Sequence, residues 1–294
     1  MSYLIFAVLA GISVTMQNSL NGLINPYLGA MGASFIGFAI QLTLLVIFQL
    51  AKEHRMVSLK NVPFYYYSSG IISSIVVGLI GFCVARMGSA VTTCCSVAGQ
   101  IVMSALVDHF GLFATKKNPF SKKRVPGFVM ILLGVLAINL IGGTQNGEAS
   151  LHFLLLAMVL GSCAIVVRTL NYKSTQAAGS SIGGGFVNSI SGTVAGGIFF
   201  IVASGFRPDL SAFLQVPLPY YLAGAFGTGC LLCNIAAYKK QNVFYATIFM
   251  LIGQVATGIL MDVLVFHTLS AGKCIGILIV LTGVLLDKLM TRNS

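Results

Sequence analysis

The chain has 294 residues, of which 57% are hydrophobic and 8% charged, with a formal net charge of +11 at pH 7. Soluble globular domains carry about 25% charged residues, so this composition excludes a water-soluble enzyme, a disordered tail and a conventional nucleic-acid binder. The apolar residues form long blocks rather than the alternating segments of about ten residues that build an outer-membrane barrel. The sequence therefore predicts an all-α membrane protein.

Ten apolar segments are bounded by polar residues, glycine or proline, and each approaches the ~20 residues that a bilayer-spanning helix needs. Their expected ranges are 4–24, 32–51, 65–86, 89–109, 126–143, 151–170, 181–204, 219–237, 242–264 and 271–289. The start of the chain lacks the basic region and cleavage site of a signal peptide, so the first segment is expected to remain in the mature protein.

The distribution of lysine and arginine predicts the orientation. If the N-terminus is cytoplasmic, only Arg86, Arg207 and Lys273 of the 17 basic residues fall in outer segments. Lys and Arg accumulate on the cytoplasmic side of membrane proteins, so both termini are expected inside, with an even number of helices. The same rule explains the positive net charge without a polyanionic partner.

The two halves of the sequence share spaced residues. Gln100 and Asp108 match Gln254 and Asp262 at an offset of 154. Three other segment pairs agree in order: Tyr66, Tyr67 and Gly70 with Tyr220, Tyr221 and Gly224; Gly127 and Gly134 with Gly276 and Gly283; Gly11 and Asn21 with Gly161 and Asn171. Five helices per half is an odd number, so the second half enters the membrane from the opposite side. We therefore expect two inverted repeats, residues 1–145 and 146–294, with a substrate site near the midplane.

The runs Ala85–Gly88, Ala98–Gln100 and Asp108–Phe113 carry a family resemblance. They resemble the drug/metabolite transporter (DMT) superfamily and, more narrowly, its small inner-membrane exporter branch, the YdcZ type. Members of that branch are often single five-helix chains, and this sequence resembles a fused double-length form. The resemblance implies ten transmembrane helices in two inverted five-helix repeats and an exporter in the cell inner membrane, and it leaves the substrate open.

Polar residues recur along the fourth segment. Ser96, Gln100 and Ser104 are four residues apart, so they share one helix face. This face, together with Gln254 in the second half, is interpreted as a substrate-binding wall of the translocation path. The alternative is hydrogen bonding between packed helices, which small polar residues often provide in membranes.

Amides crowd the outer half of the first segment. Gln17, Asn18 and Asn21 are accompanied by Asn25. Amide side chains donate and accept hydrogen bonds, so the first three are expected to bind a polar substrate that is neutral or zwitterionic.

Three charged residues have two interpretations each. Asp108 and Asp262 carry either a coupling proton or a gating or capping role, and Asp108 stands beside the basic loop 116–124. Arg168 occupies the position matched to Asn18. It either extends to the cytoplasmic surface or faces the cavity, where it would favour a substrate with a carboxylate, bound through bidentate hydrogen bonds.

The leading hypothesis is a secondary transporter that exports a small polar metabolite by alternating access, driven by an ion gradient such as protons. Alternatives are an exporter of organic cations or drugs, and a membrane subunit that does not transport. The first segment lacks an acidic residue and the chain lacks Trp, which disfavours cation recognition. An intramembrane enzyme is disfavoured because the four histidines fall at segment ends or in loops.

Expected partners are a small-molecule substrate and the lipid bilayer, and the sequence is compatible with a homodimer. No cofactor, metal ion, catalytic residue or nucleic acid is expected. The seven cysteines lie in apolar segments, where a thiol serves as a small packing residue. Cys230 and Cys233 form a CxxC pair without further ligands for zinc.

Overall fold

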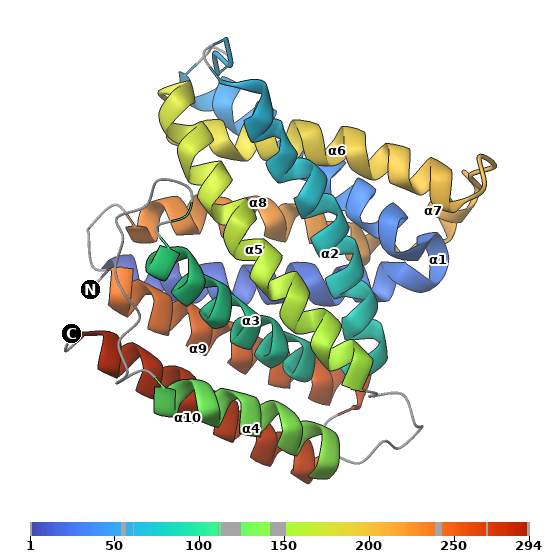
Figure 1. Cartoon of the computed structure of the whole chain (residues 1–294). Coiled ribbons are helices and arrows are strands. Elements are labelled where there is room, and N and C mark those ends of the chain that lie inside the picture. The colour runs from blue at the N-terminus through green and yellow to red at the C-terminus, as the bar shows by residue number, and fades with distance from the viewer. Residues whose placement is uncertain are drawn as a thin grey trace.

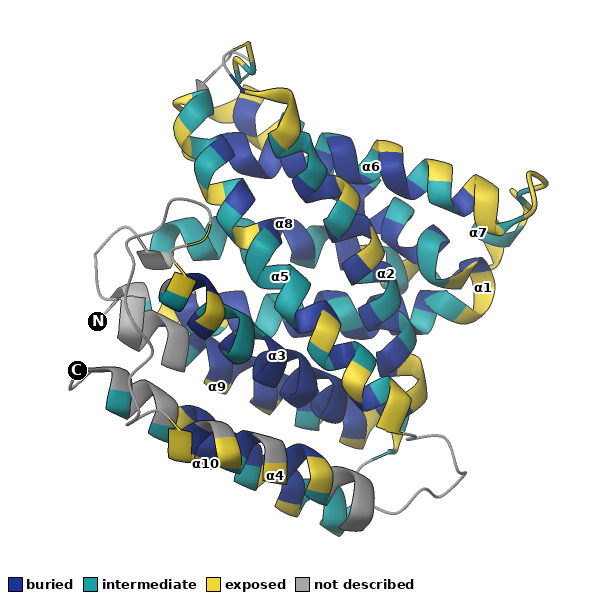
Figure 2. Ribbon diagram, viewed as in Figure 1, coloured by how far each residue is buried: buried dark blue, intermediate teal, exposed yellow. Residues whose placement is uncertain are grey.

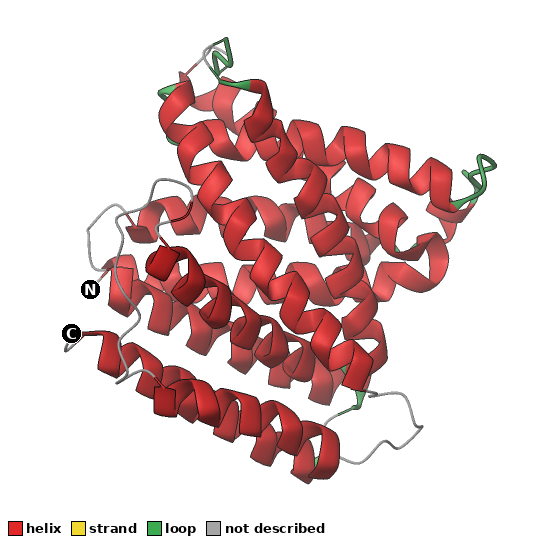
Figure 3. Cartoon of the chain, in the orientation of Figure 1, coloured by secondary structure: helices red, strands yellow, loops and turns green. Residues whose placement is uncertain are grey.

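The computed structural model describes residues 2–53, 57–60, 62–110, 112, 125–141, 151–238, 243–268 and 270–292. Within these ranges all regular secondary structure is helical (Figure 3). The major helices are α1 (Ser2–Glu53), α2 (Ser68–Met87), α3 (Ser89–Phe110), α4 (Val125–Ile141), α5 (Leu151–Ala178), α6 (Gly183–Ala203), α8 (Leu222–Tyr238), α9 (Val243–Met261) and α10 (Ala271–Arg292). Shorter elements are η1 (Phe64–Tyr67), α7 (Ala212–Gln215), η4 (Leu218–Tyr221) and the π-helical turn η5 (Asp262–Phe266).

The helices have the length and composition of a membrane protein. Six helical segments of the described chain are long and apolar enough to cross a bilayer, and α4 and α10 contain shorter apolar stretches. The start of α1 and the end of α10 lie on the same side of the molecule (Figure 1). These features agree with the predicted all-helical membrane class.

The first two predicted segments are both helical, and together they make up α1: two helices meet at a kink at Gly29, where a short loop was expected. Only Gly29 leaves the helical conformation, with φ 68° and ψ 174°. Positive φ is accessible to glycine because it has no Cβ, so one residue is enough to break the helix direction. Pro26 also lies inside α1, where it removes a backbone hydrogen-bond donor close to the kink.

Helices from the two matched halves cross at glycines. A Cβ on Gly11 of α1 would lie 2.0 Å from the carbonyl oxygen of Met250 in α9. A Cβ on Gly161 of α5 would lie 2.0 Å from the carbonyl oxygen of Ser96 in α3. Small residues let membrane helices approach closely, and dispersion contacts then hold them together. Gly161 and Met250 are the positions that the sequence repeat matches to Gly11 and Ser96, so the α1–α9 and α3–α5 crossings are equivalent.

The contact between α4 and α10 is symmetric, because the sequence repeat matches these two helices to each other. A Cβ on Gly134 would lie 3.1 Å from the carbonyl oxygen of Gly276, and one on Gly283 would lie 2.9 Å from that of Gly127. The repeat matches Gly127 to Gly276 and Gly134 to Gly283, so each helix makes the contact that its counterpart makes. The two helices pack mainly on each other and join the rest of the bundle through α3 (Figure 1).

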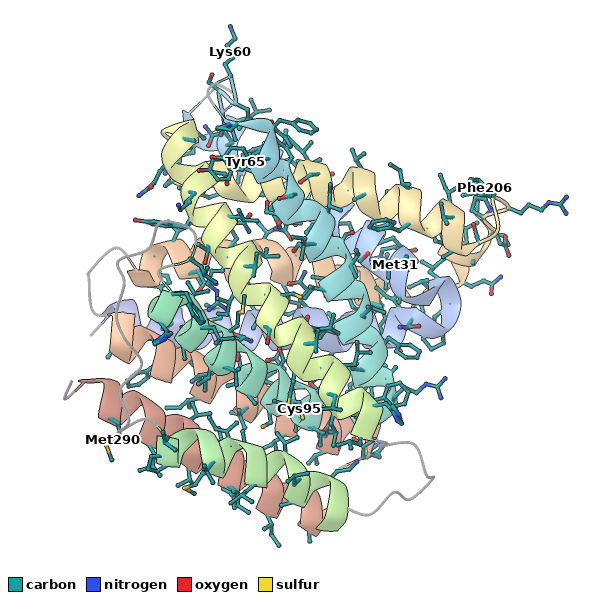
Figure 4. The ribbon with its side chains drawn as sticks, viewed as in Figure 1. Met31, Lys60, Tyr65, Cys95, Phe206 and Met290 are labelled. Atoms are coloured by element: carbon teal, nitrogen blue, oxygen red, sulfur yellow. The ribbon has the colours of Figure 1, made fainter. Side chains whose placement is uncertain are left out.

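Buried residues lie inside the bundle and exposed residues on its outside (Figure 2). Many of the exposed residues are large and apolar. The largest apolar core joins α2, α3, α4, α5, α9 and α10. Cys95 lies in this core, whereas Lys60 and Phe206 project from loops (Figure 4). Leu133, Ile198 and Leu278 are more than half exposed on α4, α6 and α10. Such exposure suits helix faces that contact lipid.

Candidate functional site

A chain of polar side chains connects α3 to α5. Gln100 Nε2 donates a hydrogen bond to Ser96 Oγ at 3.4 Å, so the two residues share the face that their spacing predicts. Arg168 Nη2 donates to Gln100 Oε1 at 3.3 Å. Ser104, further along α3, is half-buried. The structure therefore brings together Ser96, Gln100 and Arg168 from the predicted set.

Arg168 lies nearer the middle of α5 than either end, because the helix continues to Ala178. The sequence predicted that the segment ends at 170, which placed Arg168 at the inner edge. The helix extends because its polar residues bond within it: Ser174 and Thr175 hydroxyls both donate to the carbonyl oxygen of Asn171. Hydropathy marks only the apolar part of such a helix, so it set the boundary too early.

Gln254, the repeat counterpart of Gln100, lies at the α1–α9 crossing. The hydroxyl of Thr15 donates to the backbone oxygen of Gln254 at 3.2 Å. The side-chain oxygen of Gln254 is buried and has no hydrogen-bond partner among the described residues. This amide therefore retains an unused acceptor inside the bundle.

Two asparagines at matched positions also have buried side-chain atoms without hydrogen-bond partners in the described structure. Asn21 is fully buried, and neither atom of its amide has a partner within the described part of the chain. The oxygen of Asn171, its counterpart in α5, is likewise buried and unpartnered there. A buried polar group without a partner costs about 1–3 kcal/mol. Asn18, one turn before Asn21, is half-buried.

Two further amides, Gln41 and Asn171, belong to this polar region although the sequence analysis did not assign them to it. Gln41 and Gln17 converge on Gly227 of α8: a Cβ there would lie 2.7 Å from Gln41 Oε1 and 2.8 Å from Gln17 Nε2. The approach of Gln41 depends on the kink at Gly29, which brings the two helices of α1 side by side. Asn171 could have been found, because it is the repeat match of Asn21.

Asp262 binds the N-terminus of α3. Its carboxylate is fully buried, and its two oxygens accept hydrogen bonds from the backbone N–H groups of Ser89 and Ala90, the latter at 3.0 Å. An acceptor with negative charge at this position stabilises a helix through its unpaired N–H groups and its dipole. This geometry is that of the cap, one of the two interpretations of Asp262. The side chain of Asp108 lies outside the described residues.

Gly88 makes the turn before this cap possible. Its φ is 91°, and a Cβ there would lie 2.3 Å from the hydroxyl oxygen of Thr268. Lys273 Nζ in turn donates to the backbone oxygen of Thr268 at 2.8 Å. The α2–α3 turn, the end of α9 and the start of α10 are thus fastened together around the carboxylate of Asp262.

The two halves differ in how tightly equivalent helices pack. Gly22 of α1 is buried, and a Cβ on it would lie 3.0 Å from a methyl carbon of Val84 in α2. Its repeat counterpart in α5, Tyr172, is 63% exposed. The described parts of α5 and α8, which correspond to α1 and α2, do not pack closely on each other. The second half is therefore more open at the positions where the first half is closed.

The guanidinium of Arg168 lies at this open region. The Arg168 side chain is exposed, its hydrogen bond to Gln100 directs it toward α3, and its charge acts on Cys230 of α8. All seven cysteines are free thiols, and no group of three His, Cys, Asp or Glu side chains within the described ranges could hold a metal ion.

Comparisons with known proteins agree with this architecture. The family model described as "Putative inner membrane exporter, YdcZ" matches residues 2–137 and again residues 152–286. A search of curated proteins finds no match. A solved structure, described only as the crystal structure of a protein, has a TM-score of 0.58 at 15% identity and covers 98% of this chain and 97% of its own. This likeness shows a shared fold alone. The chain, matched twice over nearly its whole length, belongs to the YdcZ-type family of inner-membrane exporters within the DMT group, and it is a multi-pass protein of the inner membrane.

Proposed function

We propose that this protein is a secondary transporter that exports a small polar metabolite by alternating access. Two inverted five-helix repeats, residues 1–145 and 146–294, make ten membrane crossings with both termini in the cytoplasm. Counting α1 as two crossings on either side of Gly29 gives five helices to each half. The equivalent α1–α9 and α3–α5 crossings and the common side of α1's start and α10's end support this arrangement.

The observation that carries the proposal is the unequal packing of matched helices. In the proposed orientation Gly22 and Val84 lie toward the outside, where α1 and α2 are packed. Tyr172 lies toward the cytoplasm, where α5 and α8 are apart. In an inverted-repeat transporter the two halves exchange conformations during the cycle. The structure then corresponds to a state open to the cytoplasm, and packing α5 on α8 while separating α1 from α2 opens the other side.

The buried amides supply the substrate contacts. Asn21, Asn171 and Gln254 come from helices of both halves and hold polar atoms without partners in the described structure. At about 1–3 kcal/mol for each unpartnered group, hydrogen bonds to a substrate would offset a cost that the fold otherwise carries. Amides accept and donate, so a polar metabolite fits them better than an apolar drug.

Asp262 acts as the outer gate in this cycle. Its cap on α3 ties α9 to the α2–α3 turn, which is the contact that must loosen when the outer side opens. The proposed driving force is the proton gradient, since the sequence contains no phosphate-binding loop for ATP. Asp108, the repeat match of Asp262, is the corresponding candidate for gating or proton coupling at the inner end.

Transport in proteoliposomes tests the proposal. The purified protein is reconstituted into vesicles loaded with a mixture of amino acids, hydroxy acids, polyols, sugars, nucleosides and tetraphenylphosphonium. Efflux is measured by mass spectrometry with and without an imposed pH gradient. We expect a polar metabolite to leave these vesicles faster than it leaves protein-free vesicles, at a rate that depends on the pH gradient. Vesicles that contain the Gln254→Leu variant should retain it.

The control is Gly229→Ala on α8, where an added Cβ meets no atom closer than 3.4 Å. This variant should transport like the unmodified chain. Protein-dependent efflux of tetraphenylphosphonium and of no metabolite would refute the metabolite exporter and indicate an exporter of organic cations. Equal efflux from protein-containing and protein-free vesicles would refute the transporter and leave a structural subunit.

A further inference from the structure

We propose that the exported metabolite carries a carboxylate, and that Arg168 is the residue that selects it. This inference rests on the proposed function and names the substrate class of that same site. The carboxylate would be bound by the guanidinium of Arg168 between α3, α5 and α8, in the region open to the cytoplasm.

The charge of Arg168 is not neutralised by a carboxylate in the described part of the chain. The carboxylates whose side chains are described are engaged elsewhere: Asp262 caps α3, and Asp209 accepts hydrogen bonds from the backbone and hydroxyl of Ser211. Ionisable side chains within transmembrane helices usually face the bundle interior or a water-filled cavity and mark a substrate pathway. An anionic substrate would pair with this charge during the part of the cycle in which it is bound.

The present partner of Arg168 is weak. Its hydrogen bond to Gln100 Oε1 is 3.3 Å long, and that amide is itself held by Ser96 at 3.4 Å. Charge-assisted bonds from arginine to carboxylate are about 2.7–2.9 Å and are often bidentate. A carboxylate therefore offers the guanidinium a shorter and stronger pair of bonds than the amide does. Gln100 orients the guanidinium without satisfying it.

The guanidinium is also reachable. The Arg168 side chain is exposed, and the exposed Tyr172 follows one turn later on α5. The matched positions in the first half are Asn18, which is half-buried, and Gly22, which is buried. One half thus presents an accessible positive charge where the other presents a neutral amide. A single positive charge matches a metabolite with one carboxylate and further polar groups for the amides.

The experiment compares what cells release. Cells overproducing the unmodified chain, Arg168→Gln, Arg168→Lys or the control Lys173→Gln are grown in parallel, and their media are analysed by untargeted mass spectrometry. Lys173 lies on the same helix but does not bond to Gln100. Its replacement therefore removes one positive charge from α5 and leaves the Arg168–Gln100 hydrogen bond in place. Size-exclusion chromatography in detergent and quantification in the membrane verify that each variant is folded and present.

We expect the metabolites enriched by the unmodified chain to carry a carboxylate. Arg168→Gln should reduce their enrichment about 10- to 100-fold, as loss of a charge-assisted hydrogen bond predicts. Arg168→Lys should reduce it less, because lysine keeps the charge but not the planar pair of donors. Lys173→Gln should leave it unchanged.

The outcomes separate this inference from the transporter itself. Enriched metabolites without a carboxylate, or equal enrichment of carboxylates by Arg168→Gln, would overturn the carboxylate inference and leave an exporter. The absence of any enrichment by the unmodified chain, together with no efflux in proteoliposomes, would overturn the proposed function and this inference with it. If Arg168→Gln does not fold, a profile for Arg168→Lys identical to that of the unmodified chain overturns the bidentate recognition.

Discussion

Replacing Asp262 tests whether this carboxylate caps a helix or carries protons. The side chain is fully buried and accepts two backbone N–H groups of α3, from Ser89 and Ala90. Asp262→Ala would leave both N–H groups without partners, at about 1–3 kcal/mol each, or roughly 2–6 kcal/mol in all. At about 2–4 °C per kcal/mol for a domain of 150–250 residues, the melting temperature should fall by roughly 4–24 °C.

Asp262→Asn separates the two roles. Its oxygen can still accept one N–H, but its nitrogen meets the other donor, so we expect about half of the stability loss and impaired transport at every pH. Asp209→Asn is the matched control, because this loop residue also accepts the backbone N–H of Ser211, at 2.9 Å, but in an exposed position. Melting is followed by size-exclusion chromatography after heating in detergent. An Asp262→Asn variant of unchanged stability that transports without responding to the pH gradient would refute the cap and assign proton coupling to this residue.

Three further predictions concern the bundle. Gly161→Ala should destabilise the protein by about 1–3 kcal/mol, since its Cβ would lie 2.0 Å from a carbonyl oxygen; heating in detergent beside Gly229→Ala, which should melt like the unmodified chain, measures this. On a background without native cysteines, Gly22→Cys with Val84→Cys should form a disulfide, because the Cβ atoms would lie 3.2 Å apart, near the 3.5–4.5 Å of disulfides. Oxidation should stop transport and dithiothreitol should restore it, whereas transport by the crosslinked protein would exclude separation of α1 from α2. Asn21→Leu should raise the melting temperature by removing an unpartnered buried amide and should abolish transport; a more stable variant that still transports would take Asn21 out of the substrate site.

The sequence predicts much of this architecture because an internal repeat is visible as matched residues at a constant offset, whatever contacts those residues make in the folded protein. Gly11 and Gly161 could be matched by counting, and the structure places both at equivalent helix crossings. The spacing of Ser96 and Gln100 predicts a shared helix face, which their hydrogen bond confirms. Periodicity and offset are properties of one chain read in order, so a sequence is sufficient for them.

Contacts between distant segments are a different matter. The break between the first two segments was predicted, but the connection is shorter than expected: the two helices meet at Gly29 alone, because a single glycine with positive φ is enough to turn the chain. The meeting of Gln17 and Gln41 at Gly227 follows from that kink and has no local signal. The end of α5 was predicted too early because its last turns are polar. The hydroxyls of Ser174 and Thr175 form hydrogen bonds within the helix, to the backbone oxygen of Asn171. The sequence left two interpretations of Arg168 open. The hydrogen bond to Gln100 directs its side chain toward α3, and this contact between distant segments has no signal in the sequence.

The glycine crossings have a consequence for how the chain becomes stable. The contacts α1–α9, α3–α5, α4–α10 and α2–α6 each join a helix before residue 146 to one after it. Neither stretch can therefore bury its helix faces by itself, because many of them pack against helices of the other stretch. The first stretch therefore becomes stable only when the second has been inserted beside it. If the two repeats are inverted as proposed, two separately produced stretches should assemble when they are inserted in opposite directions.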